Sequence, residues 1–175
     1  MTDGELLALC RQGHETAFAE LVGRYRHRLW SICFRVAGNR EDAEEAVQDT
    51  LTSAWQNLHK FRGEAKVSTW LYRIAANASL AVVRKRKETV ADFDVIELED
   101  PAPLTADRVA DVDAVRRALS ELPEDFRVAI VLREFAEMSY ADIAEHQGIP
   151  VATVKTRINR ARTQLTALLA PTRTS

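Results

Sequence analysis

The first hundred residues of this chain contain no proline, and three glycines divide them into long stretches in which apolar residues recur at helical spacing. Proline breaks helices because it lacks a backbone N–H and clashes with the preceding turn, so its absence leaves long helices free to form. No convincing strand-like alternation runs between the glycines, which are Gly13, Gly38 and Gly63. The N-terminal half is therefore predicted to be a helical bundle.

Charge divides the chain into three segments, which the formal net charge of −2 conceals. Residues 1–88 carry a net charge of +3, residues 89–113 of −7, and residues 114–175 of +2. The middle segment shows no sustained apolar period, so it is predicted to be an extended, solvated linker. A loop within one domain is less favoured, because structureless loops of this length are uncommon. The expected fold is all-α, with two small helical domains joined by an acidic flexible linker.

The composition excludes several other classes of protein. No apolar run approaches the roughly 18 residues of a transmembrane helix, and the acidic opening with Asp3 and Glu5 argues against a signal peptide. Cys10 and Cys33 form neither a CxxC pair nor a disulfide framework, which fits a reducing cytoplasm. The histidines stand in no metal-ligand spacing, so neither a metal nor another cofactor is expected.

The stretch from Glu41 to Leu58 is predicted to be an amphipathic helix with one apolar stripe. The stripe consists of Ala43, Ala46, Val47, Leu51, Ala54, Trp55 and Leu58. Acidic side chains cover the remaining face near the start of the helix, where the helix dipole favours them. That face is either a solvated surface or a docking surface for a basic partner.

A basic loop at residues 60–67 precedes a second helix, which is predicted to run from Ser68 or Thr69 to about Lys87. Aromatic residues lie near its start, and four consecutive basic residues, 84–87, form its end. Basic residues suit a helix C-terminus for electrostatic reasons alone. Aromatic and cationic side chains together are also typical of single-strand binding surfaces, in which bases stack on the rings.

The C-terminal block has the layout of a helix-turn-helix. After a helix from Pro123 to about Phe135, a short helix is expected at 140–147, capped by Ser139, then a turn at Gly148 and a longer helix at 151–169. The inward residues of the longer helix are Val154, Ile158, Ala161 and Leu165, and the outward ones are Thr153, Thr156, Asn159, Arg160 and Thr163. Its first two turns carry no acid, as entry into the major groove requires, although helical hairpins that bind no DNA share this outline.

Three strings of residues resemble the bacterial RNA polymerase sigma factors. Residues 42–50 (DAEEAVQDT), followed by Trp55, are similar to the family's most recognisable segment, and residues 68–77 (STWLYRIAAN) to its promoter-melting segment. Residues 139–144 (SYADIA) and 153–157 (TVKTR) resemble the family's domain 4. The strings occur in the family's order and represent domains 2 and 4 alone, as in the extracytoplasmic-function (ECF) subfamily of the sigma-70 family.

The resemblance implies a transcription initiation factor, not an enzyme, with domain 2 at residues 1–88, an acidic linker at 89–113 and domain 4 at 114–175. The residues implied to dock on the clamp coiled coil of the largest subunit of core RNA polymerase are Asp42, Glu45, Gln48 and Asp49. Those implied to bind the single-stranded −10 element of promoter DNA are Phe61, Arg62, Lys66, Trp70, Arg73, Asn77 and Arg84. Those implied to contact the −35 duplex are Thr153, Lys155, Thr156, Arg157 and Arg160.

The resemblance also implies a cytoplasmic protein, associated with the nucleoid in the holoenzyme, which an anti-sigma factor holds inactive and can retain near the membrane. The chain itself is not expected to insert into a membrane.

Two residues depart from the family's pattern. Ala152 stands where the family usually has glycine, and Ala81 where it often has aspartate; both are expected to shift promoter preference. The linker spans up to about 80 Å when extended and is expected to follow the basic RNA channel of the polymerase. The acids expected to matter there are Asp92, Asp94, Glu97, Glu99 and Asp100.

Two other classes of protein stay open from the residues alone. A repressor with a C-terminal helix-turn-helix and an N-terminal effector domain would bind duplex DNA tightly as a homodimer, without polymerase. A nucleic-acid enzyme has less support, because the sequence shows no clustered acids and histidines, no phosphate-binding glycine loop and no activated nucleophile.

Overall fold

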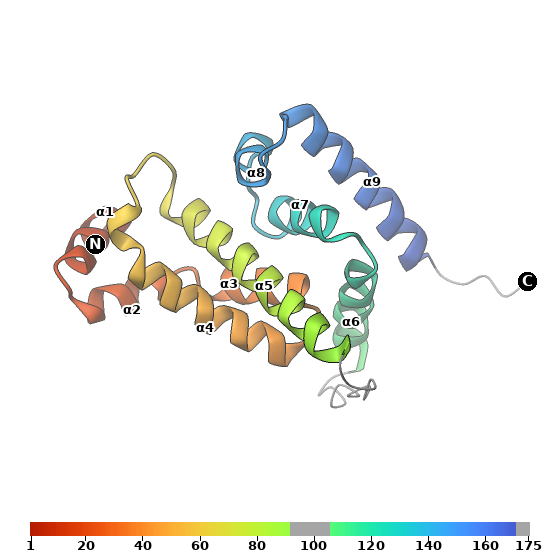
Figure 1. The fold of residues 1–175 in the computed structure, drawn as a ribbon, viewed down its shortest axis with the longest axis horizontal. Coiled ribbons are helices and arrows are strands. Elements are labelled where there is room, and N and C mark those ends of the chain that lie inside the picture. The colour runs from red at the N-terminus through yellow and green to blue at the C-terminus, as the bar shows by residue number, and fades with distance from the viewer. Residues whose placement is uncertain (92–105, 171–175) are drawn as a thin grey trace, which may run out of the picture.

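The computed structural model describes residues 1–91 and 106–170 (Figure 1). Its first part consists of α1 (Asp3–Arg11), α2 (Glu15–Gly23), α3 (Arg26–Ala37), α4 (Arg40–Gln56), a short 3₁₀ turn (Leu58–Lys60) and α5 (Val67–Ala91). The long helices α3, α4 and α5 pack on one another, and α1 and α2 cover one end of this bundle. The predicted helical bundle is thus confirmed within the described residues.

Helix α4 forms where the apolar stripe predicts it. The Asn39 side chain caps its start by accepting a hydrogen bond of 2.9 Å from the Asp42 backbone N–H. Most of the predicted stripe is buried or half-buried against the rest of the bundle. The helix ends at Gln56, so Leu58 belongs to the 3₁₀ turn instead, where it is still buried.

The second part consists of α6 (Ala106–Ser120), α7 (Glu124–Glu134), α8 (Tyr140–Gln147) and α9 (Val151–Leu169). Ser139 caps α8 by accepting from the Asp142 N–H at 3.0 Å, and Gly148 ends the helix with a φ of +67°, which favours glycine. The predicted inward residues of α9 pack on α7 and α8, with Val154, Ile158 and Ala161 fully buried. The helix-turn-helix layout is confirmed.

The predicted linker is helical at both of its ends, so the expectation of an extended chain over 89–113 is wrong there. Helix α5 continues to Ala91, and α6 begins at Ala106. The predicted boundary divided α6 in its middle: the buried residues Ala118 and Leu119 lie beyond it, so the segment taken alone showed no apolar period. The five acids expected to matter in the polymerase channel, 92–100, lie outside the described residues.

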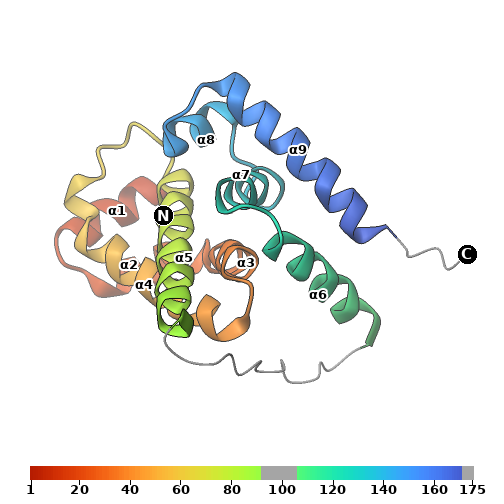
Figure 2. The same cartoon turned by 45° about the vertical axis from the view of Figure 1, so that its right-hand side comes forward.

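The two parts pack against each other, with α6 and α7 on α3 and α7 also on α5 (Figure 2). Arg127 of α7 lies at the centre of this contact and is only 6% exposed. Its guanidinium donates to the carbonyls of Leu119, Ser120 and Leu122 and, across the contact, to Val36 at 3.0 Å. Burial lowers its pKa from the ordinary value.

A second arginine, Arg116, donates a hydrogen bond to the same end of α3. Arg116 of α6 donates to the Gly38 carbonyl at 2.5 Å. Gly38 ends α3 with a φ of +92°, and a Cβ there would lie 3.0 Å from the Ser120 hydroxyl. Cations suit a helix C-terminus, where carbonyls lack intrahelical partners.

Among the described residues, no helix has the length and hydropathy that a membrane crossing requires.

Candidate nucleic-acid interface

The outward face of α9 is exposed and carries no acid. Lys155, Thr156 and Arg160, three of the residues predicted to contact duplex DNA, are exposed on it, and Thr153 is half-buried at its edge. The Thr156 hydroxyl donates to the Ala152 carbonyl at 3.1 Å, which leaves its oxygen free to accept. This face therefore presents cations and small polar groups on a helix that the α7–α8 layer supports from behind.

Arg157, the fifth predicted −35 residue, points towards the body of the domain. Its guanidinium donates to the Gln147 side chain at 3.3 Å and lies 3.8 Å from an Asp125 carboxylate oxygen. Its carbon also lies 6.0 Å from the centre of the Phe126 ring. Arg157 thus fastens α9 to α7 and α8.

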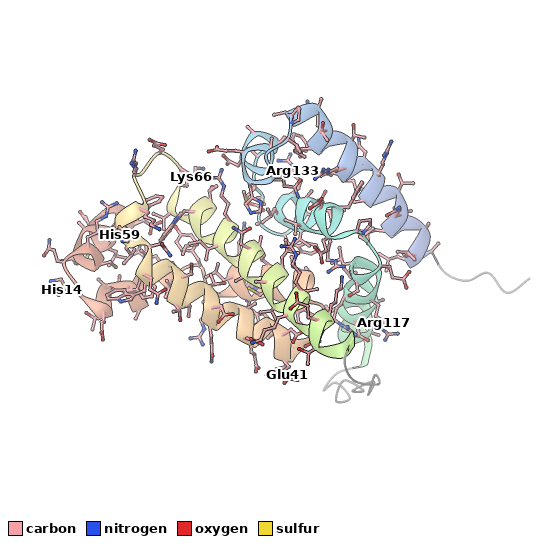
Figure 3. All side chains as sticks on the ribbon, viewed as in Figure 1. His14, Glu41, His59, Lys66, Arg117 and Arg133 are labelled. Carbon is pink, nitrogen blue, oxygen red and sulfur yellow. The ribbon has the colours of Figure 1, made fainter. Side chains whose placement is uncertain are left out.

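The loop between the 3₁₀ turn and α5 borders a hollow of 410 Å³. Lys66, labelled in Figure 3, and Arg62 are exposed on this loop. Phe61 is 7% exposed, and its ring packs 5.0 Å from the half-buried ring of Trp70, centre to centre. The two aromatic residues predicted as a stacking surface thus pack on each other, and Phe61 forms part of the wall of the hollow.

Tyr25 closes another side of this hollow. Its hydroxyl donates a hydrogen bond to the Asp3 carboxylate. The same carboxylate accepts a hydrogen bond of 2.9 Å from the Arg24 guanidinium. Burial, with the contact to Asp3, raises the pKa of Tyr25 to about 12, so the phenol is neutral at physiological pH. The N-terminal helix is thereby fixed beside the loop.

The remaining predicted −10 residues lie along α5, where Arg73 is half-buried and Asn77 and Arg84 are exposed, and each contacts a side chain of the second part of the chain. Arg73 donates to the Asp142 carbonyl at 3.3 Å and to the Glu145 carboxylate at 3.4 Å. The Asn77 amide oxygen lies 2.9 Å from Nε2 of His146. Arg84 and its neighbour Lys87 both donate to the Glu124 carboxylate, at 3.3 and 3.4 Å.

His146 is half-buried in this contact. Its Nδ1 is buried and makes no hydrogen bond within the described residues, as is also true of Nε of Arg73. Burial, and then the charge of Arg73, lower the pKa of His146. A neutral ring is therefore favoured as long as α8 lies on α5.

The acidic face of α4 lies on the opposite side of α5 from this contact. Gln48 and Asp49 are exposed, and Glu45 is exposed with its carboxylate 3.6 Å from the Lys85 ammonium. Asp42 is half-buried and pairs with Arg86 as well as with the capping residue of the helix. Three of the four predicted docking residues are thus available on one helix.

Two residues of these surfaces, Asn159 and His146, are not among the site residues predicted from the sequence. Asn159 is exposed on α9 and lines a shallow hollow of 310 Å³ together with Arg160, Thr163 and Gln164. The helical phase already placed Asn159 outward, so that signal was in the sequence. His146 had no such signal, because its partners Asn77 and Arg73 lie about seventy residues earlier in the chain.

Two family models match the chain, each over one part. Residues 21–89 match the model described as Sigma-70 region 2, and residues 113–165 match the model described as Sigma-70, region 4. The chain is 36% identical over 168 residues to the ECF RNA polymerase sigma factor SigW of Bacillus subtilis, covering 89% of this chain and 90% of SigW. It is 39% identical over 171 residues to the ECF sigma factor SigM of Mycobacterium tuberculosis, covering 96% and 85%.

Two solved structures resemble the fold over nearly its whole length. One is CnrH in complex with the cytosolic domain of CnrY, with a TM-score of 0.73 and 29% identity, covering 95% of this chain and 96% of that chain. The other is the sigma factor RpoE of Bartonella quintana in complex with the anti-sigma factor NepR, also with a TM-score of 0.73, at 30% identity and covering 89% and 99%.

Proposed function

The chain belongs to the ECF subfamily of the sigma-70 family, and we propose which of its surfaces performs each step of promoter recognition. As a sigma factor it binds core RNA polymerase, directs the polymerase to specific promoters and is not an enzyme. The polymerase supplies the chemistry of RNA synthesis. The sigma factor supplies the binding free energy that selects and opens the DNA.

Domain 4 reads the −35 duplex with α9. The acid-free outward face of α9, held on a helix-turn-helix, is the observation that carries this proposal. Lys155 and Arg160 bind phosphates, which makes the affinity salt-dependent, and Thr153 and Thr156 lie where the helix enters the major groove. Arg157 serves the same surface by holding α9 in place.

Domain 2 binds the unpaired −10 strand with α5 and the loop before it. Trp70, Arg73, Asn77 and Arg84 follow one another along α5 at intervals that keep them on one side of the helix. The hollow of 410 Å³, bordered by the loop that carries Arg62 and Lys66, receives an unstacked base. Binding there offsets the unstacking cost, which is roughly a few kcal/mol for a flipped base.

The acidic face of α4 docks on the clamp coiled coil of the largest polymerase subunit through Asp42, Glu45, Gln48 and Asp49. The exposure of Glu45, Gln48 and Asp49 on one helix supports this assignment. An anti-sigma factor controls the chain, as the solved complexes of similar sigma factors suggest. A sigma factor works where the polymerase is, so the chain acts in the cytoplasm, and retention near the membrane would come from that regulator.

The experiment that tests the docking surface is co-elution of the purified chain with sigma-free core RNA polymerase. We expect the wild-type chain to co-elute at one copy per core. Glu45→Lys and Gln48→Lys should each weaken the complex about tenfold, because they place a cation on a face that meets a basic partner. The matched control is Glu15→Lys, on the exposed face of α2.

The outcome separates the sigma factor from the repressor. No co-elution with core, together with tight binding of duplex DNA by the chain alone as a homodimer, would contradict the proposed function. Co-elution that both α4 variants leave unchanged would move the docking surface elsewhere on the chain.

A further inference from the structure

Two of the side chains proposed to hold the −10 strand, Arg73 and Arg84, face acidic side chains of the chain's own domain 4. Figure 2 shows α7 and α8 lying beside α5, with α8 near the start of that helix. Arg73 meets Asp142 and Glu145 of α8, and Arg84 and Lys87 meet Glu124 of α7. Three carboxylates thus lie along one side of α5 and pair with three of its cations, Arg73, Arg84 and Lys87.

These contacts use the same donors that a DNA strand would use. A guanidinium binds a carboxylate and a phosphate through the same N–H groups, so one Arg73 head group cannot serve both fully. The Arg73 side chain is only 21% exposed in this arrangement. The amide oxygen of Asn77 is occupied by His146 in the same way.

The charged contacts are weak enough to be exchanged. The side chains of Arg84, Lys87 and Glu145 are more than 60% exposed, and exposed ion pairs contribute little to stability. We call the packing of domain 4 against domain 2 the closed arrangement. Its more buried contacts lie elsewhere, at the hydrogen bonds that Arg127 and Arg116 donate to the end of α3. The acids therefore affect access to α5 more than they affect the fold.

We infer that the acidic face of α7 and α8, formed by Glu124, Asp142 and Glu145, is an intramolecular competitor of the −10 strand for α5. In the free chain it occupies the cations of α5, and single-stranded DNA binds only when domain 4 moves away. This inference rests on the proposed assignment of the −10 strand to α5.

The test compares two variants of the full chain that lose the same charge. The interface variant combines Glu124→Gln, Asp142→Asn and Glu145→Gln. The control variant combines Glu15→Gln, Asp111→Asn and Glu121→Gln, three exposed acids away from the contact. The probe is a short random-sequence single-stranded DNA labelled with fluorescein, and fluorescence anisotropy gives its Kd.

We expect the interface variant to bind the strand about tenfold more tightly than the control variant, which should differ from wild type only by the general effect of charge. Adding Arg73→Gln and Arg84→Gln to the interface variant should abolish the gain. Spin labels at Thr52→Cys of α4 and Gln164→Cys of α9 should show a longer distance when the strand is bound.

The possible failures are distinguishable. If the interface and control variants bind the strand with equal Kd values, the proposed competition is wrong. The same holds if neither variant binds detectably. If Arg73→Gln and Arg84→Gln then weaken strand binding in the wild-type chain, the assignment of the −10 strand still stands. A gain that persists without Arg73 and Arg84 overturns both the competition and that assignment.

Discussion

The side chains on the outward face of α9 differ in what they can recognise. Lys155 and Arg160 are flexible cations, which bind phosphates at any sequence. Asn159 carries a donor and an acceptor in one plane, and its side chain is exposed. An amide of this kind pairs with the N6 and N7 edge of adenine. Asn159 is therefore the side chain of this face best suited to read a base.

Asn159→Ala should relax the preference for adenine at one position of the −35 element. The expected loss of discrimination is about 1–3 kcal/mol, confined to that position. Binding of the holoenzyme to a library of −35 sequences measures it. Arg160→Ala is the contrasting variant: it should weaken binding evenly across the library and reduce the salt dependence. A uniform loss for Asn159→Ala as well would show that it reads no base.

The sequence predicts the outward residues of α9 better than it predicts their partners. Helical phase places Asn159 and Arg160 outside, and the structure agrees. It does not show that Arg157, at the edge of the apolar stripe, reaches back to Gln147 and Asp125, because that depends on the angle between α8 and α9. In the same way, pattern alone cannot show that Phe61 packs inside the loop and does not face solvent.

At the scale of elements, the C-terminal end of α3 holds the two domains together. Arg127 and Arg116 both donate hydrogen bonds to carbonyls there. Arg127 also donates to three carbonyls at and just after the end of α6. One buried guanidinium thus satisfies two helix ends at once. A hydrogen bond from a charged donor contributes more than a neutral one, and an unsatisfied buried carbonyl is costly.

Arg127→Met should lower the free energy of unfolding by about 3–5 kcal/mol, since it keeps the volume of the side chain but leaves buried carbonyls without a donor. Urea denaturation followed by circular dichroism measures the change. The control is Arg40→Met, which removes an exposed ion pair with Glu44 and should cost less than about 0.5 kcal/mol. A loss of stability no greater than in the control would show that water replaces Arg127 easily.

Which helices form could be predicted far better than how the domains meet. Apolar spacing, capping residues and glycines act within a few residues of each other, so α4, α8 and α9 were placed closely from the sequence. The contact of Arg127 with Val36 joins residues 91 positions apart, and no local period encodes it. The acidic composition of 89–113 likewise concealed the start of α6, whose packing residues lie beyond that segment.

At the scale of the whole molecule, the closed arrangement should respond to pH through His146. Its ring contacts Asn77 of α5 and is influenced by the charge of Arg73, while Asp142 and Glu145 lie on its own helix. Burial and Arg73 lower its pKa below the usual value of about 6.5. The closed arrangement therefore binds fewer protons than the open one at mildly acidic pH, and closure weakens as pH falls through and below that usual value.

We expect the distance between spin labels on α4 and α9 to shift towards longer values between about pH 7.5 and pH 5.5, where an ordinary histidine titrates. In His146→Gln, which has no titrating ring and keeps a donor for Asn77, the distances should not change over this range. A shift of equal size in that variant would assign the pH response to other groups.

Closure also has a thermodynamic consequence for two ligands that never touch. On the inference above, the −10 strand binds only the open form, and it becomes coupled to core polymerase if core also binds that form more tightly. Whichever binds first meets the cost of opening, and the second binds more tightly by the same factor. Linkage makes this effect reciprocal, so core enzyme and single-stranded promoter become positively cooperative, and the contacts of Glu124, Asp142 and Glu145 contribute part of the coupling. Neutralising these three acids would then strengthen DNA binding by the free chain and, by the same amount, reduce its cooperativity with core.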